Sequence, residues 1–181
     1  MKTKITFIVL AAGKGSRMKS DLSKPMQNVA GKPMISYIID NIFATGFKDI
    51  ITVINNESND IKDYLKSNYP KVRTAIQESQ LGTGDAVKSV FNSYNLSDSD
   101  GIIIIFGDTP LLKLETINTL IKSISKNDLT IASFESDNPQ GYGRIILKND
   151  KLHSIVEDAE TTNVNKDIKL CNGGLMALKN N

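Results

Sequence analysis

Short apolar runs alternate with longer amphipathic stretches up to residue 134, and this alternation constrains the fold more than any other feature of the chain. The apolar runs are rich in isoleucine and valine, which favour strands, whereas the longer stretches repeat their apolar residues at helical spacing. We expect strands over residues 5–11, 50–54, 72–76, 102–106 and 129–134. We expect helices over residues 34–45, 86–94 and 114–124, and at best a short helix over 61–65.

Strands that alternate with helices predict a mostly parallel sheet covered on both faces. Right-handed crossovers then give a doubly wound, Rossmann-like α/β fold. The run of four isoleucines and Phe106 is typical of a strand buried on both faces. Ligands of such sheets bind beyond the carboxyl ends of the strands. The loops after Ala11, Ile76 and Phe106 are therefore the places where a site is expected.

The pattern changes after Phe134. Residues 144–147 and 152–156 predict a small β-hairpin around Asn149-Asp150, and residues 170–178 predict a last strand. The chain has 181 residues without an internal repeat or a low-complexity linker. We expect residues 1–181 to form one domain.

The composition excludes several classes of function. Lys plus Arg number 22 and Asp plus Glu number 20, a balance that does not favour nucleic-acid binding. The single cysteine, Cys171, cannot form an internal disulfide, which fits a reducing cytoplasm. Together with the single histidine, His153, it is too little for a Cys/His zinc site. The apolar run over residues 5–12 is too short to span a membrane and has no signal-peptide cleavage pattern, so we expect a cytoplasmic protein.

The first predicted loop has the composition of a phosphate-binding loop. It reads Leu10-Ala-Ala-Gly-Lys-Gly-Ser-Arg-Met18, in which small residues allow the backbone N–H groups to approach an anion. Three cations, Lys14, Arg17 and Lys24, lie in or just after it. The spacing is neither that of a dinucleotide fingerprint nor that of a P-loop. Backbone donors with cations suit a triphosphate, whereas an ordinary tight turn needs a glycine but not three cations.

The loop after the third strand combines amides with glycines. It reads Gln77-Glu-Ser-Gln-Leu-Gly-Thr-Gly84. Glutamine amides carry both donors and acceptors and can read the edge of a nucleobase, as can the backbone of a glycine. The alternative is a plain loop in which Thr83 caps the next helix.

Asp108 follows the most apolar strand. A carboxylate at the end of a central strand is costly unless a cation meets it, and Mg²⁺ shared with substrate phosphates is one candidate. The alternative is that Asp108 caps the next helix or closes a turn. Later groups, Gly141-Tyr-Gly-Arg144, Glu157-Asp158 and Asn172-Gly-Gly174, suit sugar hydroxyls and an amide, although Arg144 can equally be a surface charge at a strand edge.

Taken together, these motifs resemble the nucleoside-diphosphate-sugar pyrophosphorylase superfamily. The resemblance is closest to the uridylyltransferase domain of the bacterial bifunctional enzyme that makes UDP-N-acetylglucosamine. The loop over residues 10–18 marks the superfamily. The runs over residues 21–24, 29–34, 77–84, 141–144 and 155–157 narrow the match to that branch.

The resemblance implies a Mg²⁺-dependent transfer of a uridylyl group from UTP to N-acetylglucosamine 1-phosphate, without a covalent intermediate. It implies that Asp108 holds the metal and that Arg17 and Lys24 act on the phosphates. The implied nucleotide-binding residues are Leu10, Ala11, Ala12, Gly13, Lys24, Gln77, Gly82 and Thr83. The implied sugar-binding residues are Thr83, Gly143, Glu157 and Asn172.

The sequence also departs from the family. There the domain continues past the equivalent of Asn181 and supplies a second metal contact, and an acetyltransferase β-helix follows. Because that β-helix builds most of the family's trimer, the sequence favours a monomer. Two alternatives stay open: transfer from another nucleoside triphosphate or to another phosphorylated acceptor, and a nucleotide-binding module without catalysis.

Overall fold

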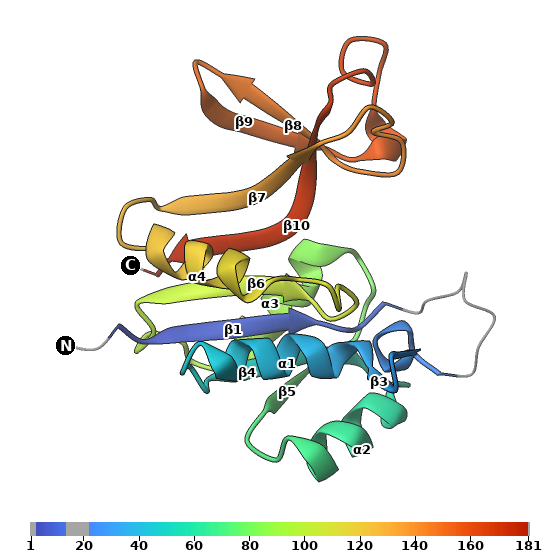
Figure 1. The fold of residues 1–181 in the computed structure, drawn as a ribbon, viewed down its shortest axis with the longest axis vertical. Coiled ribbons are helices and arrows are strands. Elements are labelled where there is room, and N and C mark those ends of the chain that lie inside the picture. Colours follow the sequence, from blue (N-terminus) through green and yellow to red (C-terminus); the bar gives the residue numbers. More distant parts are fainter. Residues whose placement is uncertain (1–2, 14–21, 181) are drawn as a thin grey trace. The chain divides into compact units, whose positions relative to one another are not determined.

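The chain divides into two compact units in the computed structural model, which describes residues 3–13 and 22–180 (Figure 1). The first unit runs to Thr130 and includes the chain from Ala177 onward. The second comprises Ile131–Met176. Strands β7 (Leu129–Glu135) and β10 (Leu170–Lys179) contribute residues to both.

Four parallel strands form the sheet of the first unit. They are β1 (Ile5–Leu10), β4 (Ile50–Asn55), β5 (Arg73–Gln77) and β6 (Gly101–Phe106), in the order β5-β4-β1-β6. The chain moves outward from β1 to β5 and then returns to the other side of β1 as β6. The strand order therefore reverses between β1 and β6, which is the point where such sheets bind ligands.

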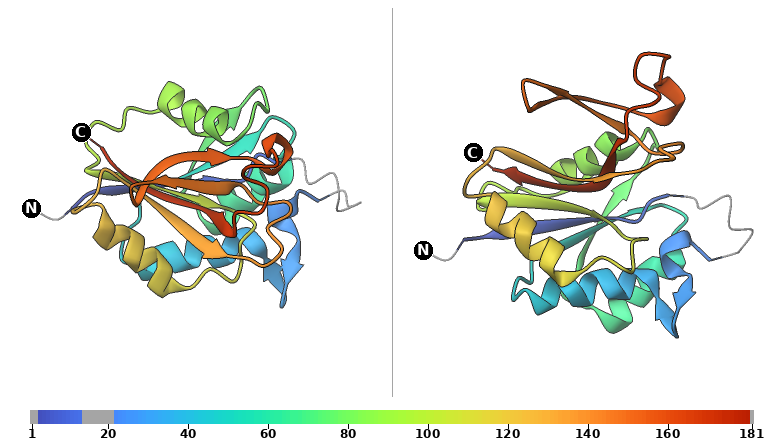
Figure 2. Two further views of the ribbon diagram at one scale, coloured as in Figure 1. Left: turned by 90° about the horizontal axis from the view of Figure 1, so that it is seen from above. Right: turned by 45° about the horizontal axis from the view of Figure 1, so that its top comes forward.

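Helices cover both faces of this sheet, which confirms the predicted doubly wound architecture. They are α1 (Met34–Ala44), α2 (Asn59–Asn68), α3 (Thr83–Ser93) and α4 (Leu114–Ser123). Helices α1 and α4 lie on one face and α3 lies on the other (Figure 2). The core between them consists mainly of isoleucines, and Ile8, Ile39 and Ile103 are among the side chains that are fully buried. Burial of this much aliphatic surface is the main force that holds the layers together.

Helix α2 is longer than the sequence predicted. It extends over ten residues, although it buries only Ile61 and Leu65. Asp60 in its first turn and Lys66 in its last turn complement the helix dipole, and polar residues fill its outer face. A helix with so narrow an apolar stripe gives little periodic signal, which explains why the sequence indicated only a short one.

Short elements precede α1. Residues Lys24–Met26 form the 3₁₀ helix η2, and β2 (Asn28–Val29) pairs with β3 (Lys32–Pro33). Ala30 and Gly31 both have positive φ at the turn between these strands, as a two-residue hairpin turn requires.

The second unit is an antiparallel arrangement. Strands β8 (Arg144–Lys148) and β9 (Lys151–Val156) form the predicted hairpin, and Asn149 and Asp150 take positive φ at its turn. The 3₁₀ helix η3 (Asp158–Glu160) follows, and β10 pairs with β7 and with β8. This region differs in kind from the parallel sheet, as the change of pattern after Phe134 predicted.

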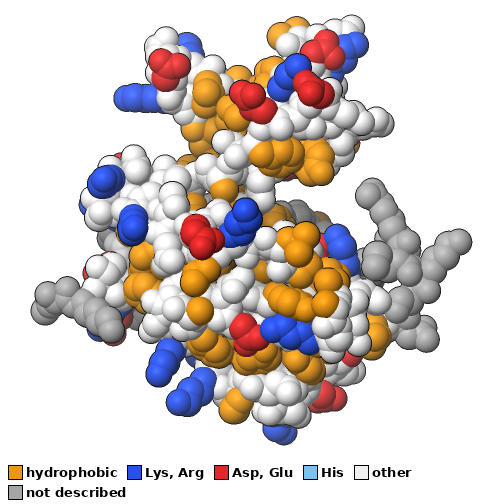
Figure 3. Space-filling model, in the orientation of Figure 1, with side chains coloured by type: hydrophobic (Ala, Val, Ile, Leu, Met, Phe, Trp, Pro, Cys, Tyr) orange, Lys and Arg blue, Asp and Glu red, His pale blue; other side chains and the backbone are white. Residues whose placement is uncertain are grey.

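The surface agrees with the balanced composition. On the face drawn in Figure 3, the acidic and basic side chains of the described residues are interspersed and do not gather by sign. Each helix within residues 3–13 and 22–180 is too short or too polar to cross a membrane. Cys171 is buried in β10 and His153 is exposed on β9.

Gly101 at the start of β6 tests how tightly α4 packs on the sheet. A Cβ atom at Gly101 would lie 2.7 Å from Cδ1 and 2.8 Å from Cγ2 of the buried Ile124. We expect Gly101→Ala to lower the free energy of unfolding by about 1–3 kcal/mol, because the core must shift to admit the methyl group. Gly84→Ala is the matched control, since its added Cβ meets nothing within 4 Å. Equal stability of the two variants in urea denaturation would contradict this packing.

Candidate active site

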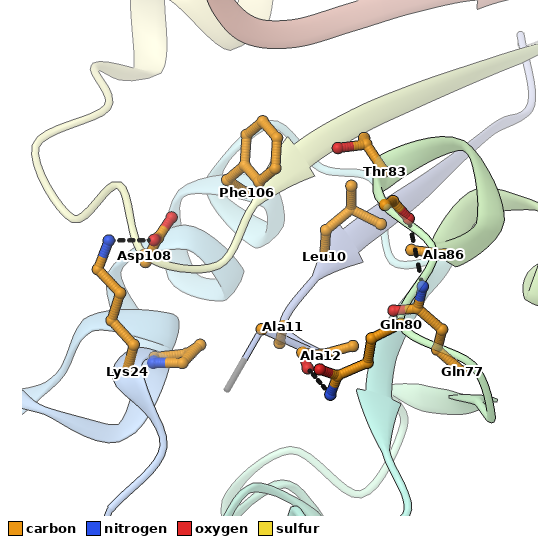
Figure 4. Close-up of a pocket in the computed structure, with 13 residues that line it drawn as sticks. Leu10, Ala11, Ala12, Lys24, Gln77, Gln80, Thr83, Ala86, Phe106 and Asp108 are labelled. Carbon is orange, nitrogen blue, oxygen red and sulfur yellow. Dashed lines mark hydrogen bonds and ion pairs between the residues drawn. The ribbon is translucent and has the colours of Figure 1, made fainter. Parts of the chain in front are cut away.

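A cavity of about 370 Å³ opens at the carboxyl ends of β1, β5 and β6 (Figure 4). All its lining residues belong to the first unit. They are Leu10, Ala11, Ala12, Gly13, Lys24, Pro25, Gln77, Gln80, Gly82, Thr83, Ala86, Phe106 and Asp108. The three loops that the sequence singled out therefore meet at one site, and its volume suits a small-molecule ligand.

The chain just after β6 comes so close to the end of β1 that a side chain at Gly107 would be crowded. The N–H group of Gly107 donates to the carbonyl oxygen of Leu10 at 2.9 Å. A Cβ atom at Gly107 would lie 3.2 Å from that same oxygen. The glycine keeps the two loops in contact and places Asp108 directly beside the first loop.

Two side-chain amides fix the start of the first loop. The carbonyl oxygen of Ala12 accepts hydrogen bonds from Asn55 Nδ2 at 2.9 Å and from Gln80 Nε2 at 3.0 Å. The amide nitrogen of Gln80 thus holds the backbone of the first loop. Asn55 does the same, although the sequence did not single it out. The sign that could have revealed Asn55 is its place as a polar residue directly after an apolar strand. The predicted cations Lys14 and Arg17 lie outside the described residues.

Gln77 presents a hydrogen-bond acceptor to the cavity. Its side chain is only 4% exposed, and its Nε2 donates to the carbonyl oxygen of Gly82 at 3.2 Å and to Asp85 Oδ2 at 2.8 Å. Its carbonyl oxygen points into the cavity (Figure 4). A ligand edge that meets Gln77 therefore meets an oxygen.

Gly82 forms the turn before α3. Its φ of 104° is a backbone conformation that favours glycine. Gly82 is the N-cap and Thr83 is the first helical residue, so the alternative in which Thr83 caps the helix is wrong. The Thr83 side chain instead lines the cavity, on the same wall as Gln77 (Figure 4).

Lys24 and Asp108 face each other across the mouth of the cavity. Lys24 Nζ lies 2.6 Å from Asp108 Oδ2, and the two side chains are 46% and 27% exposed. Asp108 does not cap α4, whose N-cap is Lys113. Among the residues that the structure describes, the cation that meets the carboxylate is therefore Lys24.

Asp60, a residue of α2, fixes the position of the backbone next to Lys24. Asp60 accepts hydrogen bonds from the backbone N–H of Ser23 at 2.8 Å and from its hydroxyl at 2.6 Å. Pro25 and Met26, which follow Lys24, are buried. The backbone on either side of Lys24 is thus anchored, while its long side chain extends to the mouth of the cavity, where an ammonium group can meet a phosphate.

Asp108 fits a magnesium ion that also binds substrate. A carboxylate is the hard oxygen ligand that Mg²⁺ prefers, and Mg²⁺ commonly takes one or two carboxylates together with phosphate oxygens. Within the described part of the chain, no group of three or more Asp, Glu, His or Cys side chains could hold a metal ion by itself. The donor set therefore fits an ion that arrives with the nucleotide.

Three of the predicted sugar-binding residues lie together in the second unit. The N–H group of Asn172 donates to the carbonyl oxygen of Gly143 at 2.8 Å. A Cβ atom at Gly143 would lie 3.5 Å from both carboxylate oxygens of Glu157, which places Gly143 beside this carboxylate. The structure brings Gly143, Glu157 and Asn172 together, as a shared role requires.

Arg144 is buried and bonds to several neighbouring segments, so its interpretation as a surface charge at a strand edge is wrong. Its side chain is 3% exposed. The guanidinium donates to Asp158 Oδ1 at 2.9 Å, to the carbonyl oxygen of Lys166 at 3.3 Å and to that of Tyr142. The hydrogen bond from Arg144, helped by the backbone N–H of Gly141, lowers the pKa of Asp158 below its usual 3.8. Arg144 thereby fixes the position of the segment that follows Glu157.

Comparison with known proteins shows the family of the chain. Residues 7–163 match the family of MobA-like NTP transferase domains, and the chain belongs to that family. It is 39% identical to the bifunctional protein GlmU of Brucella anthropi, over 95% of this chain and 38% of that protein. It is 41% identical to that of Fervidobacterium nodosum, over 93% of this chain and 36% of that protein. The predicted resemblance is confirmed, and the chain spans less than two fifths of the length of these curated relatives.

Solved structures show the same fold. HddC from Yersinia pseudotuberculosis, complexed with GMP-PN, superposes with a TM-score of 0.72 at 25% identity, over 98% of this chain and 77% of that one. A putative glucose-1-phosphate thymidylyltransferase from Bacillus anthracis, complexed with sucrose, gives a TM-score of 0.74 at 18% identity, over 97% and 72%. The second likeness shows the fold alone. The family and the fold together define a nucleotidyltransferase.

The pair of Arg144 and Asp158 predicts a pH-dependent contribution to stability. Because the pKa of Asp158 is lowered in the folded state, the pair stabilises the fold at pH values above 3.8, and this contribution is lost as the pH falls through the lowered folded value. We expect Asp158→Asn to reduce the free energy of unfolding at neutral pH and to approach the parent chain in acid.

Chemical denaturation of both chains over a range of pH measures this difference. Asp137→Asn is the control, since Asp137 pairs with Lys169 on the open surface and little stabilisation is expected from such a pair. A difference between parent and Asp158→Asn that is absent at neutral pH, or that grows in acid, would contradict the assignment.

Proposed function

We propose that this chain transfers a uridylyl group from UTP to N-acetylglucosamine 1-phosphate and releases pyrophosphate. The observation that carries the proposal is the single cavity in which a backbone-lined loop, the Lys24–Asp108 pair and the inward-facing oxygen of Gln77 meet. The sequence identity to two bifunctional GlmU proteins also supports this proposal.

Gln77 supports uracil as the base. Its oxygen faces the cavity as an acceptor, and the N3–H group of uracil is a donor. Cytosine carries an unprotonated nitrogen at N3, which would set one acceptor against another. Gly82 supplies further backbone groups on the same wall of the cavity.

The loop over Leu10–Gly13 is proposed to hold the phosphates. Its backbone donors and the ammonium group of Lys24 suit a triphosphate, and Arg17 would add a second cation. The phosphate of the sugar attacks the α-phosphorus in line while pyrophosphate leaves, so the protein has to orient the reactants and neutralise charge. Lys24 would serve both needs, because its backbone is anchored and its ammonium group lies at the mouth of the cavity, where it can offset negative charge on the phosphates.

Asp108 is proposed to hold Mg²⁺. Bound there, the ion would offset the negative charge of the phosphates and help to orient them. Lys24, which pairs with Asp108, would lie close enough to this ion to contact the same phosphates.

Gly143, Glu157 and Asn172 of the second unit are proposed to contact the N-acetylglucosamine 1-phosphate. A carboxylate and an amide can each bind sugar hydroxyls or the N-acetyl group through directed hydrogen bonds.

A second candidate is transfer from another nucleoside triphosphate or to another phosphorylated acceptor. The similarity to HddC, whose structure holds GMP-PN, supports this candidate. Guanine also presents a ring N–H donor, so the oxygen of Gln77 alone does not separate it from uracil.

Pyrophosphate release by the purified chain tests both candidates. UTP, CTP, GTP and TTP are each combined with Mg²⁺ and N-acetylglucosamine 1-phosphate, and with glucose 1-phosphate as the competing acceptor. We expect release to depend on the metal, on UTP and on the N-acetylated sugar together. Release with another nucleotide or acceptor instead would replace the proposed substrates. Nucleotide binding without any release would indicate a binding module without catalysis.

Asp108→Asn tests the role of the carboxylate. Loss of one charged group that acts on the transferring phosphates is expected to lower kcat by about 10²–10³-fold. The fold should be preserved, since Asp108 lies at the mouth of the cavity and is partly exposed. Asp63→Asn, an exposed carboxylate on α2, is the control. Turnover of Asp108→Asn that matches this control would end the assignment of Asp108 as the metal ligand.

A further inference from the structure

Asp85 lies behind the wall of the cavity that carries Gln77. It belongs to the first turn of α3 and is not among the described residues that line the cavity. Its Oδ2 accepts a hydrogen bond from Gln77 Nε2 at 2.8 Å. An ionised carboxylate can only accept, so the nitrogen of the Gln77 amide must face it.

A second acceptor reinforces this orientation. The carbonyl oxygen of Gly82 lies 3.2 Å from the same Nε2 atom. A flipped amide would set its own oxygen against both acceptors and lose both hydrogen bonds. Because the Gln77 side chain is 4% exposed, little water is at hand to replace them. The amide is therefore held with its oxygen toward the cavity, as Figure 4 shows.

We infer that Asp85 is a positioning residue that determines base specificity by fixing the Gln77 amide. With its nitrogen held by Asp85 and Gly82, Gln77 can only accept from the base. Uracil, thymine and guanine present a ring N–H donor that suits such an acceptor. Cytosine and adenine present an unprotonated ring nitrogen, and Gln77 excludes them. The inference rests on the proposed function, which assigns the base to this cavity.

A purely structural role for Asp85 makes a different prediction. An acidic residue in the first turn of a helix stabilises it through the helix dipole. Loss of that effect would weaken all nucleotides alike by loosening the start of α3. The ratio of affinities for UTP and CTP separates the two roles, because only the orientation of the amide changes that ratio.

Asp85→Asn is the informative variant. It has the same shape as the parent residue, but an asparagine amide can turn either its oxygen or its nitrogen toward Gln77. A flipped Gln77 amide then loses only the hydrogen bond to the carbonyl oxygen of Gly82, so it becomes more accessible than in the parent chain. We expect the preference for UTP over CTP to fall by about tenfold, as the loss of one buried hydrogen-bond constraint implies.

Calorimetric titration with UTP, CTP and TTP, without any sugar phosphate, measures the affinities independently of turnover. The ratio of UTP to TTP is the internal control, because both bases carry N3–H and the variant should leave this ratio unchanged. Asp63→Asn is the control for loss of an acidic side chain on a neighbouring helix. Urea denaturation of each chain shows whether the variant is folded. If Asp85→Asn does not fold, Asp85→Glu replaces it: the longer carboxylate keeps the acceptor, and the preference for UTP should be retained.

The outcomes are distinct. A preference for UTP in the parent chain that collapses in Asp85→Asn supports the inference. An unchanged ratio of UTP to CTP in folded Asp85→Asn overturns it and leaves the proposed function intact, and so does loss of the UTP preference in Asp85→Glu. Binding of neither nucleotide by the parent chain, or a preference for CTP, overturns the inference and the proposed function together.

Discussion

The close contact between β1 and β6 is the constraint on which the site depends. In the parallel register Leu10 lies beside Phe106, and the N–H group of Gly107 bonds to the carbonyl oxygen of Leu10. This places the backbone-lined loop after β1 next to the carboxylate that follows β6. The strand order reverses at this pair, so no crossover helix fills the space beyond it. The cavity follows from the topology, and side chains from three loops then give it its chemistry.

Polar groups around the cavity are arranged in two layers. Lys24, Asp108 and the oxygen of Gln77 face the ligand, whereas Asp60, Asn55, Gln80 and Asp85 hold those groups or their backbone through hydrogen bonds. Each supporting contact satisfies a donor or acceptor that would otherwise be costly to leave unpaired. In the second unit Arg144 has the corresponding task beside Glu157. A site built in this way keeps its orientation before the ligand arrives, which lowers the cost of binding.

The sequence predicted much of this, and the failures have physical causes. Strands β1, β4 and β6 are nearly continuous aliphatic runs, so their burial could be predicted directly from the sequence. The motifs after β1, β5 and β6 meet at one cavity, as expected. The polar helix α2 gave too narrow an apolar stripe to reveal its length. The pairs Lys24–Asp108 and Arg144–Asp158, and the support of Gln77 by Asp85, join side chains whose partners depend on tertiary structure. An arginine at a strand end looks exposed until the carboxylate and carbonyl groups that bury it are known.

The central claim is that the carboxyl ends of β1, β5 and β6 bind a nucleoside triphosphate. Titration of the ¹⁵N-labelled chain with UTP, followed through its backbone amide signals, tests it most directly. The account predicts that the signals of Ala11, Gly13, Gln77, Gly82 and Gly107 move together and saturate at one common affinity. Shifts confined to the opposite edge of the sheet or to residues of the second unit would contradict it, as would no shift at millimolar UTP.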